Sequence, residues 1–368
     1  MTSAELYYFI GKCLSMDDDP DARQKVHAEI SLGNVPWEEF VWMGSSHLVL
    51  PALYPVFKRN SVLPLLPADL EDHLQSIYKI NVDRNKQIKE QSFELIRILN
   101  NKGIEPVFLK GAGHLLQGLY IDDGERIMSD IDILIPEADI QKAAQALYDN
   151  GYSHPEEFIN DDFEKHHHLP GFEHKNYIAM VEIHNCVFPG SFSKILPNTE
   201  IVSEKRKLEG SAAWVLSYKH QMILNFVHDQ LVDDGFKYKS MVIKGLYDFY
   251  LISKNDPELS AASILTGFNR KFNVYCFFAS ALFNHSQKIH FKSDSSAIRF
   301  KKQFEYFLNH PEMQSGYQLL ILYRLRISEV LRLLVTAPFS RSSRKYIMKK
   351  VGNASKVKQY TQKLMRGE

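Results

Sequence analysis

One short segment restricts the fold of this chain more than any other: residues 126–136, with the sequence RIMSDIDILIP. Isoleucine at alternate positions is typical of a β-strand. Alternation predicts an apolar face of Ile127, Ser129, Ile131, Ile133 and Ile135, and an opposite face of Met128, Asp130, Asp132 and Leu134. Burying two like charges side by side costs several kcal/mol without a counter-charge. The segment therefore predicts either a cation site or an edge strand whose outer face is solvated.

The chain before this segment predicts helices. Residues 89–103 place Phe93, Ile96 and Leu99 on one helical face, and Gly103 stands where a C-terminal cap belongs. The aromatic-rich residues 37–57 predict two further helices that are separated at Pro51. We therefore expect a helical N-terminal lobe.

The middle of the chain alternates short apolar strands with helices, as α/β layers do. Strands are predicted at residues 106–110, at the aspartate segment and at residues 177–188. A helix is predicted at residues 137–152, with an apolar face of Ile140, Ala143, Ala144 and Leu147 and an end at Gly151. From Trp214 onward the pattern is helical again.

The predicted fold class is α+β, with a small mixed β-sheet between two helical lobes. The predicted parts are a helical N-lobe (1–103), an α/β core (104–210), a helical C-lobe (211–340) and a basic C-terminal segment (341–368). That last segment has nine Lys or Arg residues and one acidic residue, Glu368. It either contacts nucleic acid or an anionic membrane, or is a solvated arm, and we favour the arm.

The overall composition excludes several classes of protein. Lys plus Arg and Asp plus Glu both total 44, so no global charge favours nucleic acid. Cys13, Cys186 and Cys276 are far apart and form neither a disulfide framework nor a C-x-x-C clamp. The chain shows no signal-peptide pattern and no run of 18 apolar residues. We expect a globular, cytoplasmic protein without a transmembrane segment.

A candidate phosphate site precedes the aspartate segment. Lys110 ends a short strand, and Gly111 and Gly113 open the helix that follows. N–H groups at a helix start, together with an ammonium group, favour an anion such as phosphate. The order differs from a Walker A loop, in which Lys follows the glycines, and such a corner is also often only a tight turn. Arg126 could neutralise further phosphate charge.

A third acidic residue lies on the strand at residues 177–188, where Glu182 and His184 share a face. Residues i and i+2 of a strand lie roughly 6.5–7 Å apart, so Asp130 and Asp132 can converge on divalent cations. Mg²⁺ takes oxygen ligands and keeps positions open for phosphate oxygens. Together these residues predict a metal–triphosphate site. His184 either orients Glu182 or is simply packed.

The order of these motifs resembles the nucleotidyltransferase superfamily that shares its fold with DNA polymerase β: strand, Lys-Gly, helix, then R…SDIDILI, then VEIH. Over about residues 1–250 the chain is similar to the bacterial family of uncharacterised nucleotidyltransferases. In the wider superfamily, Gly-Ser stands where this chain has Lys-Gly, and the gap to the aspartates is shorter.

The resemblance implies a role for each motif residue. Asp130 and Asp132 would hold catalytic Mg²⁺ or Mn²⁺, and Glu182 would be the third acidic ligand or the base near the acceptor. Lys110 and the Gly111 amide would bind the β- and γ-phosphates of a nucleoside triphosphate (NTP). The implied reaction moves a nucleoside monophosphate from the NTP to a hydroxyl acceptor, which is a small molecule or a glycan, and releases pyrophosphate.

Several alternatives stay open. The enzyme could instead nucleotidylate RNA or protein, as toxin-like branches of the superfamily do, or it could be a nucleotide-binding module without catalysis. The cluster of His166, His167, His168 and His174 could bind zinc in a hydrolase, face phosphate or substrate, or form an ordinary polar loop. His228, Lys244 and Asp248 lie on predicted helices that either cover the nucleotide or are solvated or packed in the core.

Overall fold

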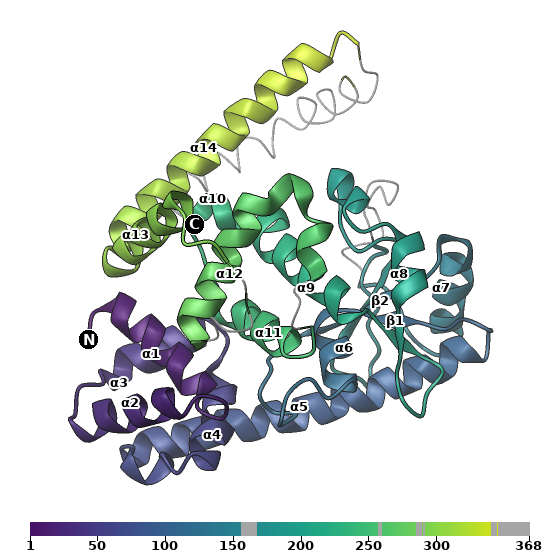
Figure 1. Ribbon diagram of the computed structural model, residues 1–368. Coiled ribbons are helices and arrows are strands. Elements are labelled where there is room, and N and C mark those ends of the chain that lie inside the picture. Colours follow the sequence, from purple (N-terminus) through teal and green to yellow (C-terminus); the bar gives the residue numbers. More distant parts are fainter. Residues whose placement is uncertain (156–167, 257–259, 285–288, 290, 340–343, 345–368) are drawn as a thin grey trace. The chain divides into compact units, whose positions relative to one another are not determined.

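The computed structural model describes residues 1–155, 168–256, 260–284, 289, 291–339 and 344. The chain divides into two compact units, Met1–Asn309 and His310–Glu368. The first unit contains the sheet and most of the helices (Figure 1). In the second unit the main described element is α14 (Pro311–Thr336). The architecture is α+β, with a five-stranded mixed sheet flanked by helices, as the sequence predicts.

The N-terminal helices are α1 (Ser3–Ser15), α2 (Pro20–Ser31), α3 (Trp37–Ser46), α4 (Leu50–Arg59) and the long α5 (Ala68–Asn100). The sheet region contains β1 (Val107–Phe108), α6 (Lys110–Leu116), β2 (Asp130–Leu134), α7 (Ile140–Asp149), β3 (Met180–His184), α8 (Asn198–Glu204), β4 (Arg206–Lys207) and β5 (Trp214–Val215). After it come α9 (Tyr218–Val227), the π-helical turn η6 (His228–Val232), α10 (Gly235–Tyr238), α11 (Ile243–Ser253), α12 (Asn269–Phe283) and α13 (Ser295–Asn309).

The sheet has the strand order β3-β2-β1-β5-β4. The pairs β2–β3 and β1–β5 are parallel, whereas β1–β2 and β4–β5 are antiparallel. In the β2–β3 register Asp132 is opposite Glu182, and Leu134 is opposite His184. Strand β5 lies beyond residue 210, where we placed the end of the α/β core; the predicted domain boundaries stay predictions.

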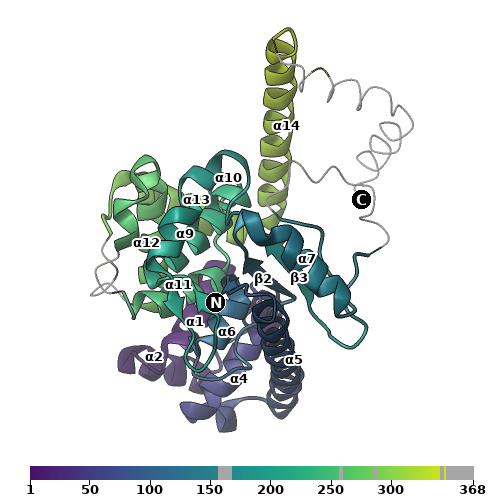
Figure 2. The same ribbon diagram turned by 90° about the vertical axis from the view of Figure 1, so that its right-hand side faces the viewer.

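Helix α5 connects two hydrophobic cores (Figure 1). Near its N-terminus, Leu70 and Leu74 belong to a core that the flanking helices share. Near its C-terminus, Leu95 and Leu99 pack with Ile131 and other residues of the face of β2 that lacks the aspartates. Helices α5 and α7 are in contact and cover this face, and Figure 2 shows both beside β2 and β3. The aspartate face is therefore turned away from α5 and α7.

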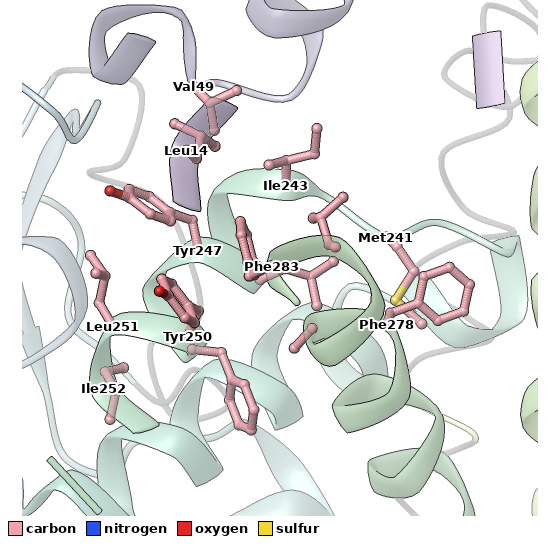
Figure 3. Packing of buried hydrophobic residues seen from close by; sticks show 14 of the residues in the cluster. Leu14, Val49, Met241, Ile243, Tyr247, Tyr250, Leu251, Ile252, Phe278 and Phe283 are labelled. Atoms are coloured by element: carbon pink, nitrogen blue, oxygen red, sulfur yellow. The ribbon is translucent and has the colours of Figure 1, made fainter. Parts of the chain in front are cut away.

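The N-terminal helices and the helices after the sheet share one core. Leu14 and Val49, from the N-terminal part, lie in the same buried cluster as Ile243, Tyr247 and Phe283, from α11 and α12 (Figure 3). Because α1 contacts both α12 and α13, the two helical regions are packed as one body within the first unit.

Two helical predictions differ from the structure. Phe93 is 55% exposed, because the buried stripe of α5 runs through Ile88, Ser92, Leu95 and Leu99 and passes beside it. The break between α3 and α4 lies at residues 47–49, and Pro51 stands in the first turn of α4, where proline is compatible with a helix.

Two strand predictions also need correction. Alternation holds only from Asp130, where β2 begins: Met128 packs into the core on the side of Ile131, and Ser129 is exposed, because neither residue is in the ladder. The strand predicted to end at Lys110 ends at Phe108, and Lys110 is the first residue of α6.

Among the described residues, no single helix has the length and hydropathy needed to cross a membrane; the pair α3–α4 meets both criteria only jointly and bends by 119°. The three cysteines are free thiols. Localisation in the cytoplasm stays a prediction.

Candidate functional site

The parallel pairing of β2 with β3 brings the predicted acidic residues to one place. Asp132 and Glu182 are register partners, and Asp130 lies one pleat away on the same face. Ligand atoms of Asp132, Glu182 and His184 lie within 4.8 Å of one another. Asp132 is buried, whereas Asp130 and Glu182 are half-buried and reach solvent. Two separate stretches of sequence thus form one cluster of Asp132, Glu182 and His184, and Asp130 lies beside this group on the same face of β2.

Asp132 is the centre of this cluster. Lys110 Nζ donates to its Oδ1 over 2.9 Å, and His184 Nε2 lies 2.7 Å from the same oxygen. Burial raises the pKa of Asp132, but the hydrogen bond from His184 and the charge of Lys110 outweigh burial and bring the pKa well below its usual range. Asp132 is therefore a carboxylate at neutral pH. Within the described residues, both contacts use Oδ1 and leave Oδ2 for another ligand.

The backbone of Lys110 has an uncommon conformation. Its φ of +42° lies in the left-handed region, which is costly for a residue with a side chain. The preceding residue, Leu109, donates its N–H to the Asp132 carbonyl over 3.0 Å, so the corner between β1 and α6 is held against β2. Burial lowers the pKa of Lys110, but Asp132 outweighs this effect and the pKa is raised. Lys110 is thus a fixed positive charge at the acidic cluster.

The other two carboxylates differ from each other. Burial, followed by the charge of Asp132, raises the pKa of Asp130. No Lys or Arg of the described chain lies within ion-pair distance of Asp130, whose side chain contacts the Ser129 hydroxyl at 3.4 Å. His184, 3.4 Å from Glu182, lowers the pKa of Glu182. Burial lowers the pKa of His184, but its bonds to Asp132 and Glu182 outweigh burial and raise it.

An open cavity of about 630 Å³ lies beside these carboxylates. It is lined by Ser129, Asp130, Ser153, Glu173, His174, Lys175, Tyr177, Ile178, Ala179, Met180 and Glu182. Asp130 and Glu182 therefore face the cavity, whereas Asp132 and Lys110 lie behind its wall and are not among the lining residues.

The glycines after Lys110 are packed tightly. A Cβ on Gly111 would lie 2.3 Å from Arg126 Nη1, and a Cβ on Gly113 would lie 2.8 Å from the Phe108 carbonyl oxygen. Both positions thus need glycine for the close approach of α6 to its neighbours. Helix α6 has only seven residues, so its dipole is small. Phosphate binding by Gly111 and Gly113 stays a prediction.

Arg126 forms a buried ion pair with Asp248 of α11. Its Nη2 and Nε lie 2.9 Å and 3.1 Å from Asp248 Oδ2, and the Tyr120 hydroxyl donates to the same carboxylate. Burial lowers the pKa of Arg126, but Asp248 outweighs burial and the pKa is raised. This pair connects the segment before β2 to α11. A contact of Arg126 with phosphate stays a prediction, and Asp248 is packed in the core.

Two other charged residues from the helices after the sheet lie within electrostatic range of the cluster. His228 forms an ion pair with Asp233 at 3.1 Å, and the charge of Lys110 acts on its pKa. Burial, followed by the charge of Arg126, lowers the pKa of Lys244, whereas Asp248 and, more weakly, Asp130 raise it. Lys244 has no ion-pair or hydrogen-bond partner for its ammonium among the described residues. In the sequence, Lys244 is one of three candidate nucleotide-covering residues, and no pattern distinguishes it from His228 and Asp248.

The histidine cluster is only partly described: His166 and His167 lie outside the described residues. The ring of His168 lies beside His184, with centroids 5.2 Å apart. The ring of His174 instead lies against Tyr152 and Tyr177, at 4.9 Å and 5.0 Å. A zinc site on these histidines stays a prediction. Tyr177 lies at the cavity wall. This position was not predicted, because nothing in the local sequence pattern distinguishes Tyr177 from a core residue.

The comparison with protein families gives a match for residues 33–283, and the family is described as uncharacterised nucleotidyltransferase. Neither a curated protein nor a solved structure matches the chain. The matched range covers more than half of the chain and contains the whole acidic cluster together with Lys110. The chain therefore belongs to the family of uncharacterised nucleotidyltransferases, which indicates a transferase that uses an NTP.

Proposed function

We propose that this protein transfers a nucleoside monophosphate from an NTP to a hydroxyl acceptor, with a divalent cation held by Asp130, Asp132 and Glu182. The observation that carries the proposal is the β2–β3 register, which sets Asp132 opposite Glu182 beside an open cavity. Family membership supports the reaction class.

The donor set fits Mg²⁺ or Mn²⁺. Both ions prefer carboxylate oxygens and keep positions for water and phosphate oxygens. Asp130, Asp132 and Glu182 supply such oxygens, and Lys110 neutralises only part of their charge. When bound, the cation would activate the acceptor hydroxyl and brace the triphosphate.

The surrounding residues would position the reacting groups. His184 donates to Asp132 and fixes the orientation of that carboxylate. Lys110 would bind the departing pyrophosphate, because its ammonium is held at the edge of the cluster. Lys244 would be a second phosphate contact, since its half-buried ammonium has no partner among the described residues and senses the charge of Asp130. Glu182, whose pKa is lowered, is ionised and can accept a proton or bind the cation.

The acceptor would enter through the cavity of about 630 Å³. Asp130 and Glu182 lie on its wall, so a hydroxyl bound there would be next to the carboxylates. The Tyr177 ring and the polar groups of Glu173 and Lys175 suit a small polar molecule or a sugar with one apolar face. An acceptor of this kind is favoured over a folded macromolecule.

The test is a screen of the four NTPs with Mg²⁺ or Mn²⁺ against pooled sugars, antibiotics, RNA and the protein itself. Pyrophosphate release and the mass of the modified acceptor are measured for the wild type and for Asp130→Asn. We expect release with at least one small hydroxyl acceptor and none from the variant. Modification of RNA or of protein would favour the alternative acceptors. Stabilisation by an NTP without pyrophosphate release would favour a binding module and contradict the proposal.

A further inference from the structure

A second group of charged side chains, separate from the β2–β3 cluster, joins α8 to the start of α9. Glu200 and Glu204 are four residues apart on α8, so they lie on the same face one helical turn apart. Lys219 and His220 belong to the first turn of α9. The β4–β5 hairpin connects the two helices, and β5 pairs with β1.

The ligand atoms of Glu200, Glu204 and His220 lie within 4.8 Å of one another, which is compatible with one shared metal ion. His220 Nε2 lies 3.6 Å from Glu200 Oε1 and 3.5 Å from Glu204 Oε2. Charge-assisted hydrogen bonds are shorter, at about 2.7–2.9 Å. Ligand atoms that lie about 2.0–2.1 Å from a tetrahedral Zn²⁺ are about 3.3–3.5 Å from one another.

His220 supplies an independent reason to expect a ligand. Its side chain is 0% exposed, and neither ring nitrogen has a hydrogen-bond partner among the described residues. A buried polar group without a partner is costly, so such groups are rare in folded proteins. The ring points its Nε2 at both glutamates.

We propose that Glu200, Glu204 and His220 bind a transition-metal dication, Zn²⁺ by their donor set, and that this ion fastens α8 to α9. Imidazole nitrogen and carboxylate oxygen are both zinc ligands, and water can take the fourth position of a site with three protein ligands. The two glutamate side chains are 32% and 41% exposed, so water and the ion can reach the site from outside.

Lys219 competes with the ion for the same carboxylates. Its Nζ lies 2.6 Å from Glu204 Oε2 and 3.8 Å from Glu200 Oε1. Zinc binding displaces this ammonium from the glutamates into solvent, because both cations cannot occupy the same oxygens. Removal of the Lys219 charge should therefore strengthen zinc binding. A purely structural ion-pair group predicts no such gain.

The experiment measures zinc in the full chain after chelator treatment and dialysis against buffered Zn²⁺, with affinities from competition with a zinc-binding dye. The variants are E200Q/E204Q, K219Q and a control, E38Q/E39Q, which removes the same charge from exposed positions on α3. Circular dichroism checks that each variant is folded, and the visible spectrum of Co²⁺-loaded protein reports a tetrahedral site with nitrogen and oxygen ligands.

We expect E200Q/E204Q to retain about one equivalent of zinc less than the wild type and the control. We expect K219Q to bind zinc about tenfold more tightly, as removal of a competing charge predicts. Equal zinc content in E200Q/E204Q and the wild type would overturn the proposal, and so would unchanged or weaker zinc binding by K219Q. All variants keep the β2–β3 cluster, so any zinc bound there is the same in each and cancels in the difference in zinc content.

Discussion

Two neighbouring stretches of the chain carry buried charges with opposite arrangements. Glu125 and Arg126 both have charged partners: Arg126 pairs with Asp248, and Glu125 pairs with Arg59 at 2.9 Å and accepts from the Tyr247 hydroxyl at 3.1 Å. Burial nevertheless raises the pKa of Glu125 to about 7. These bonds connect the segment before β2 to α4 and α11. We term this group the closed network.

Four residues later, the β2–β3 cluster has more carboxylates than cationic groups. Asp130, Asp132 and Glu182 face one lysine, Lys110, and one histidine, His184, and a cavity lies beside them. Matched charges that are shielded from water fasten structural elements, whereas surplus carboxylates open to a cavity suit a cation and its ligands. Each prediction below tests this distinction.

The largest expected effect is on turnover. Asp130→Asn should lower nucleotidyl transfer by about 1,000-fold or more, because it removes a carboxylate of the proposed cation site. The free energy of unfolding should change little, because burial and the charge of Asp132 already disfavour ionised Asp130, and no Lys or Arg of the described chain pairs with it. Steady-state kinetics and urea unfolding measure the two effects. Substantial activity in a folded variant would show that the reaction does not need this carboxylate of the β2–β3 cluster.

In the closed network the main effect of a substitution should be on the free energy of unfolding. Arg126→Met leaves Asp248 charged and buried without its partner, so we expect a loss of about 3–5 kcal/mol in the free energy of unfolding. The double variant R126M/D248L should lose less, because no unpaired charge remains. Arg97→Met is the matched control, since Arg97 forms an exposed ion pair with Glu94, worth about 0–1 kcal/mol. Equal losses for Arg126→Met and Arg97→Met would contradict a closed network.

A smaller effect is expected at Gly111, where α6 approaches the closed network. Gly111→Ala places a methyl group 2.3 Å from Arg126 Nη1, a guanidinium that Asp248 holds in place. We expect a loss of about 1–3 kcal/mol in unfolding free energy from overpacking. Gly267→Ala, where the added carbon has no neighbour within 4 Å, is the control. An unchanged free energy of unfolding for Gly111→Ala would show that Arg126 is free to move.

The smallest effect concerns pH. Burial lowers the pKa of His228, but hydrogen bonds to Asp229 and Asp233 outweigh burial and raise it to about 9. The folded pKa exceeds the unfolded value of about 6.5, so the stabilisation is fully present below pH 6.5 and is lost as pH rises through 9. Because the His228 side chain is 35% exposed, screening limits it to about 1 kcal/mol.

Chemical denaturation of the wild type and His228→Asn across this pH range measures the contribution. The stability difference between the two proteins should shrink toward high pH. His73→Asn, at an exposed position on α5, is the control and should show no such trend. A constant difference for His228→Asn would exclude the proposed ion pair with Asp233.

The sequence predicts the local parts of the site well. Alternation alone places Asp130 and Asp132 on one face, because that periodicity is a property of any extended strand. The register that sets Asp132 opposite Glu182 depends on a parallel pairing across 50 residues of sequence separation, which no local pattern encodes. The same holds for Arg126, whose partner Asp248 lies 122 residues away on a helix.

The errors have local physical causes. Phe93 has helical spacing with Ile96 but stands just outside the buried stripe, so a short window of sequence could not exclude it. Met128 and Ser129 precede the ladder, so their side chains do not follow its alternation. Tertiary packing, and not local sequence preference, decides the exposure of Phe93 and the directions of the Met128 and Ser129 side chains.

Mn²⁺ binding, measured by electron paramagnetic resonance with and without an NTP, tests the proposed cation site most directly. We expect the wild type to bind Mn²⁺ and to bind it more tightly with the NTP, whereas Asp132→Asn should lose this binding. Asp123→Asn, at a partly exposed acidic residue that pairs with Lys89, is the control and should behave as the wild type. Equal Mn²⁺ binding by the wild type and Asp132→Asn, in the presence of the NTP, would contradict the claim that these acids hold the cation.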